Sequence, residues 1–496
     1  MRRIVLLMVF VVFTTGMNAQ RVLTPLEKSG FTKLTTHQEM MDFIRELEEG
    51  HAKFEVKTIA NTVQGREIPV LEFSSSVFGQ DTSKLMVLLF AQQHGNEPSG
   101  KEGALMLVSK LASGEHGWLL DYLDIAIIPM MNPDGNEVDR RRNGNGADLN
   151  RSHLVMDQPE TIGLHKYFNE NLFHVSMDVH EYSPFSSDWM DIGFRKNSDV
   201  TAGRLTNINT PQSFRDISDS KYLPFLKEFI QIAGYTYSEY TPGGPPEAEY
   251  IRHSTYDIND GRQSIGSLGT LSFIQEGMNG KDSISNIERR AKSQMTGMQA
   301  YLTWMSDNAQ KIKPMVEAER ENIRNGYPEK VAIQMEHRSD GRVLDMPVLS
   351  LKSGKDTVIT VKNYRPVVAS IFDVKKPVGY LVPVERKDLI EWTERHGMIT
   401  TKYNPSPTHK IEEYTITAID SIDFEGDIVI NPSYTVSEMS SGNLKGAYLF
   451  IPTKQLAGNV IVQALEPKST IGLATYKKFE DLVKKGEKYP VLRLLY

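Results

Sequence analysis

An apolar run, Leu85 to Ala91, restricts the fold of this chain more than any other segment. It lacks polar alternation, which is typical of a strand covered on both faces, as in a parallel sheet. A short polar turn follows it, and Pro98 to Gly103 lead into an apolar-periodic segment, from Ala104 to Leu111, that predicts a helix. His94 and Glu97 are therefore expected at the carboxyl end of a strand, where open α/β sheets bind ligands. Across such a turn, the imidazole and the carboxylate can converge on one zinc ion.

The spacing alone is weak evidence, because the chain has twelve histidines and a second His-x-x-Glu pair at His409 and Glu412. That second pair lies in a segment that alternates like a strand, so side chains three residues apart point to opposite faces. Residues on opposite faces cannot bind one ion. The His-x-x-Glu spacing therefore indicates a metal site only where the local backbone brings both side chains to the same side.

Length and composition exclude several classes of protein. A chain of 496 residues is long enough for two or three domains with substantial cores. The net charge of −7 argues against a general nucleic-acid binder, which needs a basic excess. The absence of cysteine excludes a disulfide scaffold, a cysteine-ligated metal site and a thiol enzyme.

Residues 1–19 have the pattern of a secretory signal. Two arginines precede a short apolar run from Ile4 to Phe13, and small residues follow up to Ala19, where we expect cleavage. The apolar run is too short to span a membrane comfortably. An uncleaved anchor or a buried N-terminal helix remains the alternative. We expect an exported protein, periplasmic or extracellular, with no stable membrane insertion after cleavage.

The remaining chain divides into two parts. Over 20–325, strands are predicted at 54–60, 68–73, 85–91, 125–130, 173–179 and 270–275, and helices at 36–49, 161–171, 283–305 and 311–324. This alternation predicts an α/β fold with a mixed, largely parallel sheet flanked by helices. The segment 189–250 is expected to form loops and short helices that shape a cleft. Short alternating strands over 326–496 predict a separate β-rich C-terminal domain.

Polar residues gather at the predicted strand ends. His94 with Glu97, the loop from Arg141 to Arg151, His180 and Glu276 each follow a strand. Two histidines and one carboxylate with an open fourth position are typical of catalytic zinc. A further carboxylate can take a proton from a water molecule that zinc activates. The arginine loop either holds an anionic ligand or is a solvated surface loop.

Five motifs in this order resemble the zinc carboxypeptidase family related to carboxypeptidase A. They span about residues 25–310 and are His94-Gly95-Asn96-Glu97, Asn132-Pro133-Asp134-Gly135, Asp148-Leu149-Asn150-Arg151, Asp178-Val179-His180 and Phe273-Ile274-Gln275-Glu276. The C-terminal part, with Gly-Tyr-Leu-Val-Pro at 379–383, resembles regions appended to secreted bacterial members of the family. No chemistry is assigned to that part.

The resemblance implies one zinc ion per chain, bound by His94, Glu97 and His180. It implies that Glu276 acts as general base and then as general acid. Arg141 would polarise the scissile carbonyl and stabilise its oxyanion.

The resemblance also implies a substrate clamp. Asn150 and Arg151 would hold the terminal carboxylate of the substrate, and Tyr256 would be the mobile cleft tyrosine, with Tyr250 as the rival. We expect the residue that sets side-chain preference between Asp257 and Leu268.

The leading hypothesis is an exported zinc metallocarboxypeptidase that acts on the C-termini of peptides or proteins. One alternative keeps the metal site but acts on cell-wall peptides or N-acyl amino acids. Another is a degenerate binding protein without catalysis. The sequence leaves the oligomeric state open.

Overall fold

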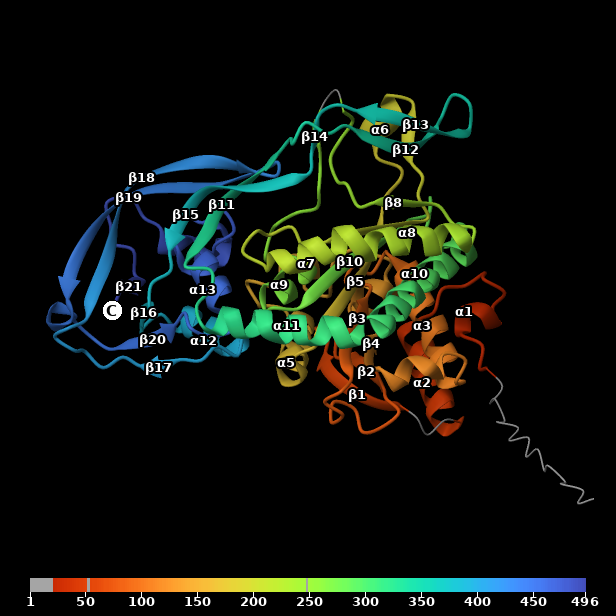
Figure 1. Cartoon of the computed structure of the whole chain (residues 1–496), viewed down its shortest axis with the longest axis horizontal. Coiled ribbons are helices and arrows are strands. Elements are labelled where there is room, and N and C mark those ends of the chain that lie inside the picture. The colour runs from red at the N-terminus through yellow and green to blue at the C-terminus, as the bar shows by residue number, and fades with distance from the viewer. Residues whose placement is uncertain (1–20, 51–53, 247–248) are drawn as a thin grey trace, which may run out of the picture.

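The computed structural model describes residues 21–50, 54–246 and 249–496 (Figure 1). The predicted signal segment, 1–19, lies outside these described residues. The first part of the chain is built on an eight-stranded sheet. Its strand order is β1 (Phe54–Asn61), β2 (Glu67–Phe73), β4 (Leu123–Ile128), β3 (Leu85–Ala91), β5 (Val175–Tyr182), β10 (Leu271–Met278), β7 (Val200–Arg204) and β8 (Tyr237–Glu239).

The four middle strands, β4, β3, β5 and β10, are parallel neighbours. The pairs of β1 with β2, of β2 with β4 and of β10 with β7 are antiparallel. The predicted α/β fold with a mixed, largely parallel sheet is therefore confirmed.

Strand β3 lies at the centre because both of its faces are covered. Leu85, Val87 and Leu89 belong to a core shared with helices on one face, whereas Met86 and Leu88 belong to a second core. The first face carries α2 (His37–Gly50), α3 (Pro98–Ala112), α8 (Leu223–Ile232) and α10 (Ile287–Asp307). On the other face lie α5 (Pro159–Asn171) and residues of the C-terminal part.

The C-terminal part is rich in strands, as predicted. Helix α11 (Ala309–Arg324) leads into it (Figure 1). A six-stranded sheet has the order β17 (Thr401–Lys402), β20 (Tyr448–Pro452), β16 (Gly379–Pro383), β21 (Leu492–Leu494), β18 (Lys410–Phe424) and β19 (Asp427–Ser440). A two-stranded sheet joins β11 (Lys330–Arg338) to β15 (Val367–Lys375). Two helices, α12 (Lys387–Arg395) and α13 (Gly458–Leu465), complete this part.

The two parts share sheets and a core. Strand β12 (Leu344–Ser350) pairs with β13 (Lys355–Val361) and with β6 (Phe194–Lys196). Strand β14 (Tyr364–Arg365) pairs with β9 (Ile251–Arg252). The second core also contains residues of both parts. The boundary at residue 325 stays a prediction, and the structure puts the two sides in extensive contact.

The segment 189–250 is more regular than predicted. Besides loops, α6 (Ser187–Asp191) and α7 (Gln212–Ile217), it contains β7 and β8, which extend the central sheet. Strand β7 is a five-residue Val-Thr-Ala-Gly-Arg run with two small residues. Its strand conformation depends on antiparallel pairing with β10 and not on its own periodicity. Within the described ranges, no helix combines the length and apolar content that crossing a bilayer requires.

Candidate active site

Three buried side chains, His94, Glu97 and His180, converge at the carboxyl ends of β3 and β5. Nδ1 of His94 lies 2.9 Å from Glu97 Oε1 and 3.2 Å from Nδ1 of His180. Nδ1 of His180 lies 3.0 Å from Glu97 Oε2. The three ligand atoms all lie within 4.8 Å of one another, so the group could hold a metal ion.

The outer nitrogens of both rings face carboxylates. Nε2 of His94 lies 3.0 Å from Asp148 Oδ1, and Nε2 of His180 lies 2.9 Å from Asp178 Oδ1. A carboxylate beside Nε2 favours the tautomer with the proton there, which leaves Nδ1 as an acceptor. The facing Nδ1 and Glu97 oxygen atoms then have no proton to share. A cation satisfies all of them, and two imidazoles with one carboxylate suit zinc.

The turn that carries His94 is packed directly against a second turn. A Cβ built on Gly95 would lie 2.1 Å from the carbonyl carbon of Gly135, so only glycine fits there. Asn132 holds the two turns together, because its side-chain amide donates to Gln93 O at 3.1 Å and to Arg141 O at 3.1 Å. This contact explains why the Asn-Pro-Asp-Gly motif accompanies the His-Gly-Asn-Glu motif.

Glu276 lies beside the three ligands without joining them. It is the register partner of His180 on the neighbouring parallel strand, β10. Burial raises the pKa of Glu276 to about 7, although the His180 ring and a hydrogen bond from Tyr240 oppose the rise. A carboxylate with a pKa near neutrality can both accept and return a proton.

A cavity of about 280 Å³ opens over this group. Arg141 Nε donates to Asp148 Oδ2 at 3.0 Å, and its Nη1 lies 3.4 Å from Glu97 Oε1. Arg151 donates to the backbone of Asn150 at 2.7 Å. The cavity lining brings together seven of the eight predicted site residues, which are His94, Glu97, Arg141, Asn150, Arg151, His180 and Glu276.

The eighth residue predicted for the site, Tyr256, lies away from this cavity. The Tyr256 side chain is buried against the C-terminal part, where its hydroxyl donates to Met335 O at 2.6 Å. Its ring packs on Phe424 and is absent from the cavity lining. The rival Tyr250 stacks on Arg365 and is also absent. Tyr240 lines the cavity instead.

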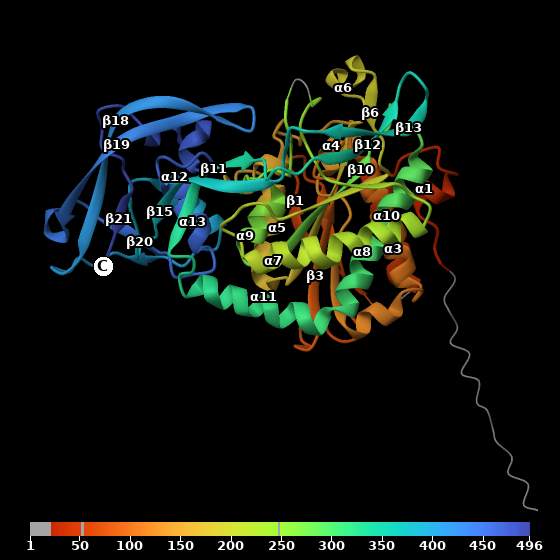
Figure 2. The same ribbon diagram turned by 45° about the horizontal axis from the view of Figure 1, so that its top comes forward.

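Sequence reasoning missed Tyr240, Arg252 and Glu425, all of which line the cavity. Tyr240 directly precedes a Thr-Pro-Gly-Gly turn, which is the one local signal that could have suggested a cleft residue. Glu425 lies in the C-terminal part, at the turn between β18 and β19. Figure 2 shows this long hairpin extending from the C-terminal sheet toward the catalytic part.

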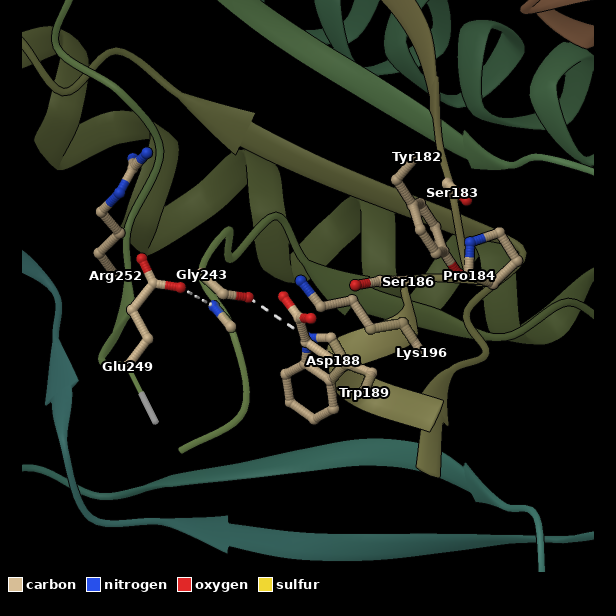
Figure 3. A pocket seen from close by; sticks show the side chains of 11 residues that line it. Tyr182, Ser183, Pro184, Ser186, Asp188, Trp189, Lys196, Gly243, Glu249 and Arg252 are labelled. Atoms are coloured by element: carbon tan, nitrogen blue, oxygen red, sulfur yellow. Dashed lines mark hydrogen bonds between the residues drawn. The ribbon is translucent and has the colours of Figure 1, made fainter. Parts of the chain in front are cut away.

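A second cavity of about 350 Å³ adjoins the first and shares Tyr182, Ser183 and Arg252 with it (Figure 3). Lys196 lies in its wall, with its ammonium group 5.6 Å from the Trp189 ring centre and donating to Thr241 O at 2.8 Å. Burial lowers the pKa of Lys196 to about 8.

The chain is similar in sequence to known carboxypeptidases. Residues 40–189 match the profile of a family described as zinc carboxypeptidase. Carboxypeptidase 2 of Trichophyton rubrum is 24% identical over 451 residues, covering 87% of this chain and 81% of its own length. Carboxypeptidase M of Mus musculus is 29% identical over 198 residues, covering 34% of this chain and 44% of its own length. Carboxypeptidase A from Helicoverpa armigera superposes with a TM-score of 0.44 and 19% identity, covering 57% of this chain and 76% of its own.

The family match includes the segment that carries all three converging side chains, His94, Glu97 and His180. Because the match to the Trichophyton rubrum protein covers 87% of this chain, it includes residues beyond 325. Residues 40–189 of this chain are thus similar to the zinc carboxypeptidase family.

Proposed function

We propose that this protein is a zinc-dependent metallocarboxypeptidase that removes C-terminal residues from peptides or proteins. One observation carries the proposal. A buried His-Glu-His group, an unliganded glutamate with a pKa near neutrality and two arginines face the same cavity. This combination supplies a cation site, a proton carrier and anion-binding groups, which are the requirements for hydrolysing a peptide bond next to a free carboxylate.

His94, Glu97 and His180 would hold one zinc ion per chain. When bound, zinc supplies a Lewis acid that polarises a carbonyl and lowers the pKa of water. Glu276 takes a proton from the attacking water and passes it to the nitrogen of the leaving amine. Its pKa of about 7 suits both steps, since neither protonation state is strongly disfavoured near neutral pH.

The arginines have separate tasks. Arg141, held by Asp148, donates to the oxygen that becomes negative during attack. Losing such a donor typically costs about 2.7 to 4 kcal/mol of transition-state stabilisation. Arg151 and Asn150 bind the terminal carboxylate of the substrate, because a planar guanidinium can bond both oxygens.

Substitution of the base tests the proposal. Glu276→Gln should abolish hydrolysis of a peptide panel while zinc content stays at one ion per chain. Glu288→Gln, on the exposed side of α10, is the matched control and should retain full activity. Full activity of Glu276→Gln, or wild-type activity that a strong chelator leaves intact, would reject the proposal.

We also propose export, from the signal-like residues 1–19. A protein recovered outside the cytoplasm should begin just after Ala19. N-terminal sequencing of the mature protein tests this, and an intact Met1 on exported protein would contradict cleavage.

A further inference from the structure

Arg262, in α9 (Gly261–Ser267), is fully buried but poorly paired. Two of its guanidinium nitrogens, Nε and Nη1, have no hydrogen-bond partner among the described residues. Nη2 reaches Thr255 O at 3.4 Å, and Nε lies 3.6 Å from Asp260 Oδ1, beyond hydrogen-bond length. Buried unpaired donors are costly and rare, so an acceptor absent from the chain itself is the natural partner.

The guanidinium lies directly behind the wall of the catalytic cavity. Thr255 and Asp260, whose oxygens lie 3.4 and 3.6 Å from it, both line that cavity. A Cβ built on Gly203 would lie 3.3 Å from Nη1 of Arg262 and 3.1 Å from Ile274, another lining residue. Since residue 203 is glycine, no side chain at this position covers Nη1.

Arg262 also adjoins the proposed clamp for the terminal carboxylate. The backbone N–H of Gly261 donates to Asn150 Oδ1 at 2.7 Å. The start of α9 therefore borders the place where the last residue of the substrate would bind.

We propose that Arg262 selects substrates that end in glutamate or aspartate. The inference rests on the proposed carboxypeptidase function and names its substrate class. A substrate carboxylate would accept from the unpaired Nε and Nη1 groups in the bidentate manner that guanidinium favours. Asp260 Oδ1 forms an ion pair with Arg262 at 3.6 Å, but at this distance it does not accept a hydrogen bond from Nε. A lysine or arginine side chain would be repelled.

Four N-acylated dipeptides that differ only in the last residue, Glu, Gln, Leu or Lys, test the inference. Gln is the isosteric neutral control for Glu. The wild-type kcat/KM should favour Glu over Gln by about 10- to 100-fold, the range of one charged hydrogen bond. Arg262→Met should remove this preference while hydrolysis of the Leu peptide continues. Equal rates for Glu and Gln in the wild type, or an unchanged ratio in Arg262→Met, would overturn it.

The control variant is Arg204→Met, which removes a guanidinium from the residue next to Gly203. Arg204 pairs with Asp219 and is not part of the cavity lining, so the Glu-to-Gln ratio should not change. Arg262→Lys keeps the charge without the planar fork and should give an intermediate ratio. If Arg262→Met does not fold, Arg262→Lys still tests the role of Arg262 through this ratio.

A binding measurement separates this inference from the proposed function. In the zinc-loaded Glu276→Gln background, calorimetry should detect tighter binding of the Glu peptide than of the Gln peptide, and Arg262→Met should remove the difference. Hydrolysis of Gln and Leu peptides without preference for Glu rejects the role of Arg262 alone. If no peptide is hydrolysed, the carboxypeptidase proposal fails, and equal binding of the two peptides then rejects the role of Arg262 as well.

Discussion

Glu425 Oε1 lies 3.2 Å from Nη1 of Arg252 at the wall of the catalytic cavity. Arg252 belongs to the catalytic part, whereas Glu425 comes from the tip of the β18–β19 hairpin in the C-terminal part. The same carboxylate accepts from His337 Nε2 at 2.7 Å and from Thr255 Oγ1 at 2.5 Å. The C-terminal part therefore contributes Glu425 to the lining of the cavity, and this residue bonds the loop that carries Thr255.

Glu425→Ala should impair both the cavity and the fold. It leaves the largely buried guanidinium of Arg252 without its carboxylate and removes the acceptor for Thr255. A charged hydrogen bond contributes about 1.5 to 3 kcal/mol, so urea unfolding should report a loss of that order. Because the loop borders the substrate, KM should rise more than kcat falls. Glu438→Ala, on the exposed part of the same hairpin, should change neither, and an unaltered KM in Glu425→Ala would show that the contact is dispensable.

Asp148→Asn should weaken zinc binding. Asp148 lies 3.0 Å from Nε2 of His94, and an amide there no longer favours the proton on that nitrogen. Loss of such a partner typically costs about 10- to 100-fold in metal affinity. Competition with a chromophoric chelator measures the effect. Asp188→Asn, at the second cavity, is the control, and equal zinc affinity in both variants would contradict the orienting role of Asp148.

The ligand-bearing strands could be predicted from sequence because their signals are local. The run Leu85–Ala91 ends next to His94, and His180 and Glu276 lie within strands that are almost wholly buried. Parallel neighbours in one sheet align their carboxyl ends, so strand order and local patterning are enough to bring these side chains together.

The positions of Tyr256 and of the cavity residues Arg252 and Glu425 could not be predicted, since they depend on contacts between distant segments. Tyr256 sits in a loop that turns toward Met335 of the C-terminal part, which local sequence does not reveal. Arg252 lies in β9, which pairs with β14 of the C-terminal part, and it contacts Glu425 of the same part. Strand β7 pairs with β10 on one side and with β8 on the other, and its own sequence has no strand periodicity.

Gly95→Ala should damage the metal site through the backbone. The added Cβ would overlap the carbonyl carbon of Gly135, at 2.1 Å, and neither turn can move without displacing His94 or Asn132. Overpacking of this kind costs about 1 to 3 kcal/mol or more. A lower melting temperature and less than one zinc ion per chain are expected. Gly117→Ala is the control, because its Cβ would meet nothing within 4 Å, and a fully zinc-loaded Gly95→Ala would refute the close approach.

Acid should destabilise the contact between the two parts of the chain. His153, His165 and His396 form a buried cluster with ring centres 5.2 and 6.0 Å apart, and His396 Nε2 donates to Leu154 O at 2.8 Å. Burial lowers the pKa of His153 and of His396 to about 4, and it also lowers that of His165. The ordinary histidine pKa in an unfolded chain is about 6.5.

Between pH of about 4 and 6.5, these histidines are protonated in the unfolded chain but stay neutral in the folded protein. The free energy of unfolding should therefore fall as the pH drops through this window, by about 1.4 kcal/mol per pH unit for each ring, and should not depend on these rings above it. Urea unfolding at pH 7.5, 6.5, 5.5 and 4.5 measures the slope. His396→Gln keeps a donor for Leu154 O but cannot be protonated. The slope of its unfolding free energy against pH should therefore be shallower than the wild-type slope by the contribution of one histidine. Parallel slopes for the wild type and His396→Gln would mean that other groups cause the acid sensitivity.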